Sequence, residues 1–278
     1  MPLRLIATDL DGTLLDRERA ITPRTVAAVQ SAVAAGIEFV LVTARPPRTV
    51  AHLAERLGGG IAALCGNGTI LAEFGPPRAD PNPNRDDYVG KITLIRTFTT
   101  KDAVAIVDQL KPVLPEAGFA LETGYEVYFE TEFRVGSVAD HHRILTDNLT
   151  GIAPQMPSIV KVLARSPDRT ADEMVALALS TLTVDAEVSH SGGHGLLEIA
   201  PPGASKASAL SWLCERRGIA PSDVAAFGDM PNDLPMLRWA GQGHAVSNAH
   251  PEVLAAADHV VGHHAEDGVA LAIEALLS

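Results

Sequence analysis

Short apolar runs that lead into a polar residue or a tight turn recur along the first third of the sequence, and they constrain the fold more than any other feature. Three such runs are residues 3–8, 37–42 and 61–64, which lead into Asp9, Thr43 and the turn Gly66-Asn67-Gly68. The stretches between them have helical spacing, and Thr22-Pro23 fits an N-cap followed by proline. This alternation predicts a Rossmann-like, doubly wound α/β core in which helices cover both faces of a parallel sheet.

The last third of the sequence repeats the same pattern. A helical stretch, residues 206–217, stops at Gly218, and the short apolar run 224–227 leads directly into Gly228-Asp229. Two more short strands are expected at residues 244–246 and 259–261, before a closing helix. We therefore expect both ends of the chain to build one sheet.

The middle of the chain differs in composition. Residues 80–87 (DPNPNRDD) form a polar stretch with two prolines, as in a linker, and the block that follows contains all three tyrosines and four of the seven phenylalanines. Its alternating pattern at residues 119–133 predicts a hairpin that turns near Gly124, and Thr170 with Glu173 predicts a capping box. We interpret residues 85–190 as an inserted α+β domain, and residues 1–84 with 191–278 as the discontinuous core.

Composition limits the partners. A chain of 278 residues with 46% apolar residues can bury a core large enough for two domains, and no apolar run approaches the roughly 20 residues of a membrane helix. The net charge of −12 disfavours nucleic acid and anionic membranes, so an anionic substrate would need a local cation. The opening MPLRLIATDLDG has no long apolar segment of a secretory signal, and the two cysteines have no metal-ligand spacing, so we expect a cytoplasmic location and reduced thiols.

The strongest chemical signal is Asp9-Leu10-Asp11-Gly12-Thr13-Leu14, directly after the first predicted strand. In open α/β sheets, ligands bind at the carboxyl ends of the strands. Two carboxylates so close together repel each other unless a cation lies between them, and Mg²⁺ prefers oxygen ligands. A metal site at this sheet edge is therefore expected.

A second acidic loop, Gly228-Asp229-Met230-Pro231-Asn232-Asp233, follows another short strand. If it lies beside the first, several carboxylate and amide oxygens converge in a site for a hard cation without Cys or His ligands. Thr43, at the end of a strand, offers a hydroxyl and an N–H to a phosphate. Lys206 begins a helix, where an ammonium group and the helix N-terminus could both face an anion.

These four segments resemble the four motifs of the haloacid dehalogenase-like hydrolase superfamily. The match is specific in DLDGTLL at residues 9–15, around Lys206 and in GDMPND at residues 228–233. Residues 66–69, 248–253 and 267–270 resemble the Cof-type subfamily, and the middle block resembles its type IIB (C2B) cap in size and position. The similarity covers about 170 residues at the two ends of the chain. One departure is Thr43-Ala44-Arg45 where this subfamily usually has Thr-Gly-Arg, with a methyl group that could crowd the backbone or shift Arg45.

The resemblance implies a phosphatase that acts on a small phosphorylated metabolite. Asp9 would attack phosphorus and form an aspartyl-phosphate, and Asp11 would act as general acid and then as general base. Thr43 and Lys206 would orient the transferring phosphoryl oxygens. The cap would close over the site and contact the leaving group.

The resemblance also implies how the metal is held. Mg²⁺ would bind Asp9, the backbone carbonyl of Asp11, and Asp229. Asn232 and Asp233 would hold these ligands in place or contact the metal through water. Two interpretations stay open for Arg45, a contact with the cap or a surface charge. Two also stay open for Asn67, the cap of a turn or a contact with substrate.

Other functions are also compatible with parts of the pattern. A phosphomutase or phosphotransferase would share the motifs but return the phosphoryl group to substrate. A non-catalytic binder of phosphorylated ligands would normally have lost Asp9 or Asp11, and a receiver-like signalling module is shorter and lacks a large insertion. A histidine metal site is not expected, because the pairs His141-His142 and His263-His264 are adjacent and no spaced motif exists. For His190 and His194, a surface loop is favoured over a contact with substrate.

Overall fold

A computed structural model of the chain describes residues 3–76, 89–133, 142–190 and 195–278. Their contacts divide the chain into two compact units, one formed by residues 1–93 with 205–278 and the other by residues 94–204. The boundary expected at residues 84–85 lies outside the described residues, as does residue 191 of the second boundary. His141 and His194 also lie outside them. Each unit is described by itself below.

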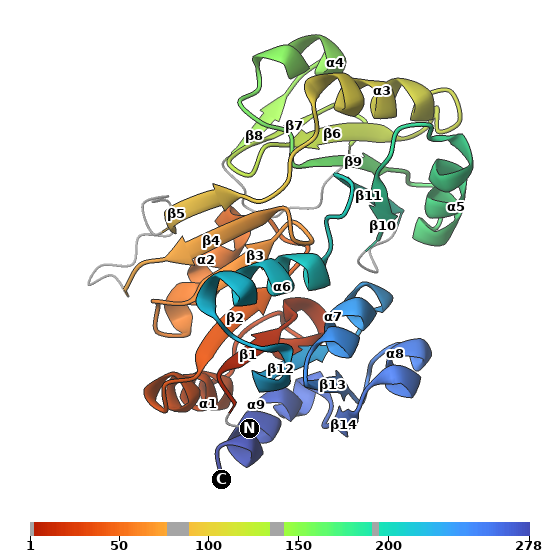
Figure 1. Cartoon of the computed structure of the whole chain (residues 1–278). Coiled ribbons are helices and arrows are strands. Elements are labelled where there is room, and N and C mark those ends of the chain that lie inside the picture. Colours follow the sequence, from red (N-terminus) through yellow and green to blue (C-terminus); the bar gives the residue numbers. More distant parts are fainter. Residues whose placement is uncertain (1–2, 77–88, 134–141, 191–194) are drawn as a thin grey trace. The chain divides into compact units, whose positions relative to one another are not determined.

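The first unit contains an eight-stranded sheet in the order β14-β13-β12-β1-β2-β3-β4-β5 (Figure 1). The strands are β1 (Leu5–Thr8), β2 (Glu38–Val42), β3 (Ala62–Cys65), β4 (Ile70–Phe74), β5 (Val89–Leu94), β12 (Val224–Gly228), β13 (Gln242–Val246) and β14 (His259–Val261). The strands from β14 to β3 run parallel, and β4 runs antiparallel to β3. The expected parallel α/β core is confirmed, with an added edge formed by β4 and β5.

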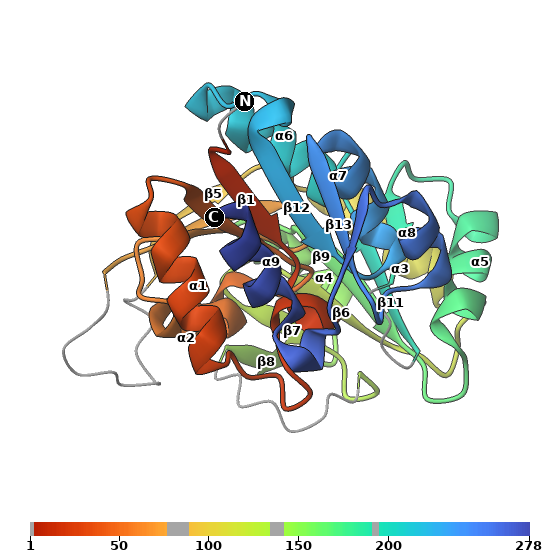
Figure 2. The same cartoon turned by 90° about the horizontal axis from the view of Figure 1, so that it is seen from below.

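Helices cover both faces of this sheet. They are α1 (Pro23–Ala34), α2 (Pro47–Arg56), α6 (Lys206–Arg217), α7 (Leu234–Trp239), α8 (Pro251–Ala256) and α9 (Gly268–Leu276). Figure 2 shows α1 and α9 on one face, and α6 and α7 on the other. The central strands are consequently apolar on both sides, and Leu5, Ile6 and Leu41 are fully buried.

Local sequence explains where several elements begin and end. The Thr22 hydroxyl accepts a hydrogen bond from the Thr25 N–H at the start of α1, as the sequence predicts. Helix α6 ends at Gly218, which adopts a left-handed conformation with φ of 64°. Both cysteines, Cys65 and Cys214, are buried thiols.

The second unit is an α+β layer with a six-stranded sheet in the order β10-β11-β9-β6-β7-β8. Its strands are β6 (Gly118–Glu122), β7 (Val127–Phe129), β8 (Arg143–Leu145), β9 (Lys161–Arg165), β10 (Glu187–Ser189) and β11 (Leu196–Ala200), and its helices are α3 (Thr100–Leu110), α4 (Leu149–Ile152) and α5 (Ala171–Thr181). The hairpin predicted around Gly124 is confirmed as β6–β7, and the capping box of Thr170 and Glu173 starts α5. Phe119, Ile106 and Met174 belong to one apolar core between sheet and helices.

Among the described residues, no helix is both long and apolar enough to cross a membrane.

His244 on β13 is a buried histidine with an unusual environment. Its ring stacks between Phe227 and His259, with centroid distances of 4.7 and 4.8 Å, and neither ring nitrogen has a hydrogen-bond partner among the described residues. Burial lowers the pKa of His244 to about 4, His259 adds to the effect, and Asp258 opposes it. The folded protein therefore resists protonation of this ring.

We expect this histidine to make the fold sensitive to acid. The pKa of His244 lies below its ordinary value of 6.5, so the unfolded chain binds the extra proton first and stability falls as the pH drops from 6.5 toward 4. In urea unfolding, the free energy of unfolding should fall between neutral pH and about pH 4.5, and His244→Phe should remove roughly 2–3 kcal/mol of this loss. His259→Gln, at an exposed neighbour, should retain most of that loss. Identical pH dependence in His244→Phe and the unmodified protein would contradict the assignment.

Candidate active site

The turn after β1 carries the first two carboxylates. The Asp9 N–H donates to the Phe227 carbonyl at 3.0 Å, which extends the pairing of β1 with β12 by one residue. The chain then forms a wide turn, Leu10–Leu14, closed by a hydrogen bond from the Leu15 N–H to the Leu10 carbonyl. Asp9 is 5% exposed, so its carboxylate lies in the protein rather than on its surface.

Both the backbone conformation at position 12 and the space around it require glycine. Its φ is +80°, a conformation that residues with a side chain rarely adopt. A Cβ at this position would also lie 2.4 Å from the Asp229 carboxylate. The turn that carries Asp9 and Asp11 can therefore approach the second acidic loop only because residue 12 has no side chain.

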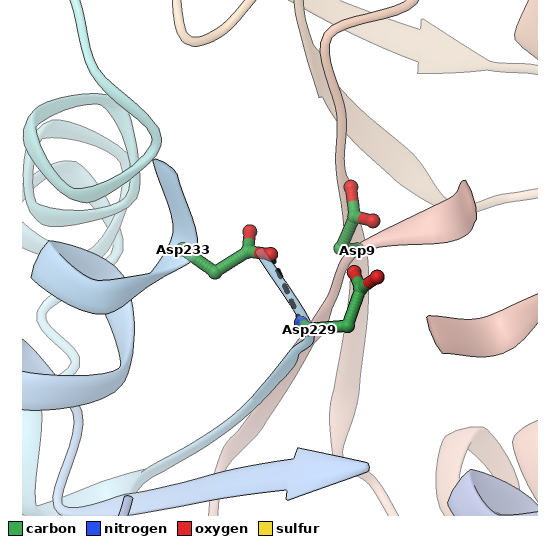
Figure 3. A group of neighbouring side chains, drawn as sticks. All are labelled: Asp9, Asp229 and Asp233. Carbon is green, nitrogen blue, oxygen red and sulfur yellow. Dashed lines mark hydrogen bonds between the residues drawn. The ribbon is translucent and has the colours of Figure 1, made fainter. Parts of the chain in front are cut away.

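The second acidic loop follows β12 and is tied together by Asp233. This side chain is fully buried, and its Oδ2 accepts hydrogen bonds from the N–H groups of Asp229 and Met230 at 3.1 and 3.0 Å. Figure 3 shows the carboxyl groups of Asp9 and Asp229 side by side, with Asp233 bonded to the Asp229 backbone. The two acidic loops thus meet at the carboxyl ends of β1 and β12.

Lys206, the first residue of α6, supplies the local cation. Its side chain is 2% exposed, and Nζ lies 2.6 Å from Asp9 Oδ1 and 2.6 Å from Asp233 Oδ1. Burial alone would lower the pKa of Lys206, but Asp233 and Asp9 outweigh it and raise the pKa, so the ammonium stays charged. A capping box of Ser205 and Ser208 fixes the start of the helix.

The acidic cluster has the properties of a site for a divalent cation. Ligand oxygens of Asp9, Asp229 and Asp233 lie within 4.8 Å of one another, all three residues are buried, and no other such group occurs among the described residues. Burial raises the pKa of Asp9 well above its usual range; the charge of Lys206 opposes this rise, and the charges of Asp233 and Asp229 add to it. Burial and the charge of Asp233 also raise the pKa of Asp229 to about 6. A further cation beside Asp9 and Asp229 would favour their ionised forms, which burial disfavours.

The donor chemistry also fits a hard cation. All three side chains offer carboxylate oxygens, which suit Mg²⁺. The buried Oδ1 of Asn232, in the same loop, has no hydrogen-bond partner among the described residues, so it is available to a bound water or ion. Both oxygens of Asp233 are already used by Lys206 and the backbone, which leaves Asp9 and Asp229 as the better placed ligands.

The remaining predicted residues lie around this cluster in different ways. Thr43 is buried at the end of β2, and its hydroxyl oxygen accepts from the Arg45 N–H at 3.1 Å. Arg45 forms an ion pair with Asp11. Asn67 is buried in the β3–β4 turn with φ of 57°, and its Oδ1 makes a long 3.4 Å contact with Asn232 Nδ2.

Three residues support the site that sequence reasoning did not select. The Thr13 hydroxyl donates to Asp229 Oδ1 at 2.9 Å, Asn248 Nδ2 donates to the Gly12 carbonyl at 2.8 Å, and the His264 ring lies 2.7 Å from the Leu15 carbonyl. Thr13 and Asn248 lie in segments with a family resemblance, which is the only signal that could have indicated them. Their contacts join positions more than 200 residues apart.

Thr13 gives a direct test of how the acidic loop is held. Thr13→Val keeps the shape of this buried side chain but removes the hydrogen bond to Asp229, so the carboxylate should lose its orientation. We expect Mg²⁺ affinity, measured by calorimetry, to fall about 10–100-fold. Thr25→Val, at a buried threonine of α1, should leave the affinity unchanged. Equal affinity of Thr13→Val and the unmodified protein would show that this hydroxyl does not orient a metal ligand.

Comparison with known proteins agrees with this geometry. Residues 6–273 match the family model of haloacid dehalogenase-like hydrolases. The chain therefore belongs to the haloacid dehalogenase-like hydrolase family, and it is an enzyme.

Relatives and solved structures match along almost the whole chain. The chain is 29% identical to pyridoxal phosphate phosphatase YbhA of Escherichia coli, with 97% of each chain covered. It is 31% identical to 5-amino-6-(5-phospho-D-ribitylamino)uracil phosphatase YwtE of Bacillus subtilis, with 99% of each covered. A haloacid dehalogenase-like hydrolase structure from B. subtilis matches with a TM-score of 0.81 at 24% identity, covering 98% of this chain and 99% of that one.

Proposed function

We propose that this chain is a Mg²⁺-dependent phosphomonoester hydrolase that acts on a small phosphorylated metabolite through an aspartyl-phosphate at Asp9. The observation that carries the proposal is the buried cluster in which Asp9 and Asp229 lie beside each other, with Lys206 bonded to Asp9. Family membership and the phosphatases among its relatives support the same reaction.

Asp9 is the proposed nucleophile. Lys206 binds its Oδ1, so the ammonium fixes the carboxylate that would attack phosphorus. As the new O–P bond forms, the bond from phosphorus to the leaving oxygen breaks. In the second step water attacks phosphorus, the bond to Asp9 breaks, and inorganic phosphate leaves.

Asp11 is the proposed general acid and base. It lies two residues beyond the nucleophile on a turn whose backbone is not helical, and its side chain is 45% exposed. It would give a proton to the leaving oxygen in the first step and take one from the attacking water in the second. The Thr43 hydroxyl and the Lys206 ammonium would contact the phosphoryl oxygens.

Asp9, Asp229 and the backbone carbonyl of Asp11 would hold the metal, with Asp233 and Asn232 supporting them. Bound there, Mg²⁺ would offset the repulsion between the carboxylates and an anionic phosphate. Selection of the leaving group is proposed to lie in residues 94–204, the part of the chain that resembles a cap only loosely.

A phosphate-release screen with the purified protein tests the proposal. The panel would contain pyridoxal phosphate, 5-amino-6-(5-phospho-D-ribitylamino)uracil and several sugar phosphates, each with Mg²⁺ and with EDTA. We expect free phosphate from at least one compound with Mg²⁺ and none with EDTA. Isomerised substrate without free phosphate would instead indicate a phosphomutase, and no turnover of any kind would count against the hydrolase assignment.

A further inference from the structure

Arg45 contacts Asp11 through two parallel hydrogen bonds. Its Nε lies 2.7 Å from Asp11 Oδ2, and its Nη2 lies 2.5 Å from Asp11 Oδ1. This bidentate arrangement matches the planar guanidinium to the planar carboxylate, so it fixes the plane of the carboxyl group as well as its position.

The backbone of Arg45 is held in place independently of this pair. Its N–H donates to the Thr43 hydroxyl at 3.1 Å, and its carbonyl accepts from the Gly66 N–H at 3.0 Å. Pro46 follows and restricts the Arg45 backbone to extended conformations, before α2 begins at Pro47. The guanidinium is therefore presented from a rigid segment between the ends of β2 and β3.

The exposure of the pair argues against a mainly stabilising role. The side chains of Arg45 and Asp11 are 21% and 45% exposed, and ion pairs with that much access to water contribute little to stability. Asp11 lies on the non-helical turn after Asp9, and no other hydrogen bond to its carboxylate is seen in the described part of the chain. Its direction is thus set chiefly by Arg45.

We propose that Arg45 is a positioning residue that orients the Asp11 carboxyl group for proton transfer. The inference rests on the proposed function, because it assumes that Asp11 exchanges protons with the leaving oxygen and with water. In the first step the Asp11 proton passes to the leaving oxygen as its bond to phosphorus breaks. In the second, Asp11 takes a proton from the attacking water, and Arg45 itself exchanges none.

The test compares two leaving groups in the phosphorylation step. An alkyl phosphate that the screen identifies needs a proton on its leaving oxygen, whereas p-nitrophenolate departs without one. Under single-turnover conditions we expect Arg45→Met to slow alkyl phosphate cleavage by about 10–100-fold and p-nitrophenol release by less than about 3-fold. Arg45→Lys keeps the charge but loses the bidentate geometry, so its rate should fall between those of Arg45→Met and the unmodified protein.

A second pair provides the matched control. Arg24 of α1 and Glu274 of α9 form the same bidentate contact, at 2.9 and 2.7 Å, and because neither residue belongs to the acidic cluster, Arg24→Met should leave both rates unchanged. In an Asp11→Asn background, Arg45→Met should cause no further loss, because the group that it orients is already absent.

Each outcome decides the inference. Equal slowing of both substrates by Arg45→Met, no slowing of either, or a full effect in the Asp11→Asn background would overturn it. The proposed function fails separately, if the unmodified protein releases no phosphate or if Asp9→Asn keeps full activity. If Arg45→Met does not fold, the same comparison of alkyl phosphate cleavage with p-nitrophenol release is made with Arg45→Lys.

Discussion

Asp9→Asn is expected to abolish Mg²⁺-dependent phosphate release. An amide at this position is a far weaker nucleophile than the carboxylate that Lys206 holds beside Asp229, so the first step of the proposed reaction should stop. We expect kcat to fall by on the order of 10⁴-fold or more, as when a catalytic nucleophile is removed elsewhere. The measurement is steady-state phosphate release from the best substrate of the screen.

The same variant should fold normally. Asp233 still pairs with Lys206 at 2.6 Å, and the change removes one of three carboxylates that repel one another. The thermal midpoint in EDTA should therefore equal or exceed that of the unmodified protein. Retention of most of the activity in a well-folded Asp9→Asn protein would refute the assignment of the nucleophile.

Lys206→Met is expected to cause the largest loss of stability among single changes at the site. The ammonium is 2% exposed and bonds to Asp9 and Asp233, so its removal leaves buried carboxylates without their cation. Breaking a buried ion pair in this way costs about 3–5 kcal/mol of unfolding free energy. The measurement is urea unfolding in EDTA.

Metal should partly replace the lost charge. Mg²⁺ that binds only the folded protein raises its stability, and we expect a larger gain in Lys206→Met than in the unmodified protein. Lys111→Met breaks a more exposed pair with Glu130, with side chains 45% and 12% exposed, and should cost no more than about 1 kcal/mol. Similar losses in Lys206→Met and Lys111→Met would contradict the electrostatic account of the buried cluster.

The meeting of the two acidic loops was predictable from the sequence. Asp9 and Asp229 each follow a short apolar run, and the carboxyl ends of parallel strands lie along one edge of a sheet. The structure pairs β1 with β12 directly, which brings these loops together although they are 220 positions apart in the sequence. Alternating patterns do not reveal strand order, so the residues alone leave the meeting of the loops conditional, and the resemblance implies it by assigning Asp9 and Asp229 to one metal ion.

Other features depend on contacts that no local pattern encodes. The β3–β4 hairpin places an antiparallel strand, Ile70–Phe74, at the edge of the core sheet, and β5 follows it there. The sequence predicts that the β5 residues belong to the inserted block, because a polar stretch precedes them. Composition signals a linker, but the pairing of the strand that follows depends on its neighbours in space.

The side-chain partners at the site are a further case. Arg45 on the loop after β2 binds Asp11, and Thr13 binds Asp229. The first contact spans 34 positions and the second 216. Such contacts follow from the packed structure, so the sequence pattern selects Arg45 without its partner Asp11 and does not select Thr13.

Chemical trapping of the intermediate tests the central claim most directly. The protein would be mixed with Mg²⁺ and its best substrate, quenched in acid within the first turnover, reduced with borohydride and digested for peptide mass analysis. An acyl phosphate on Asp9 is reduced to the alcohol, so homoserine should appear at position 9 only when substrate and Mg²⁺ are both present. Full phosphate release with an unchanged Asp9 peptide, or with the modification on another carboxylate, would contradict the account.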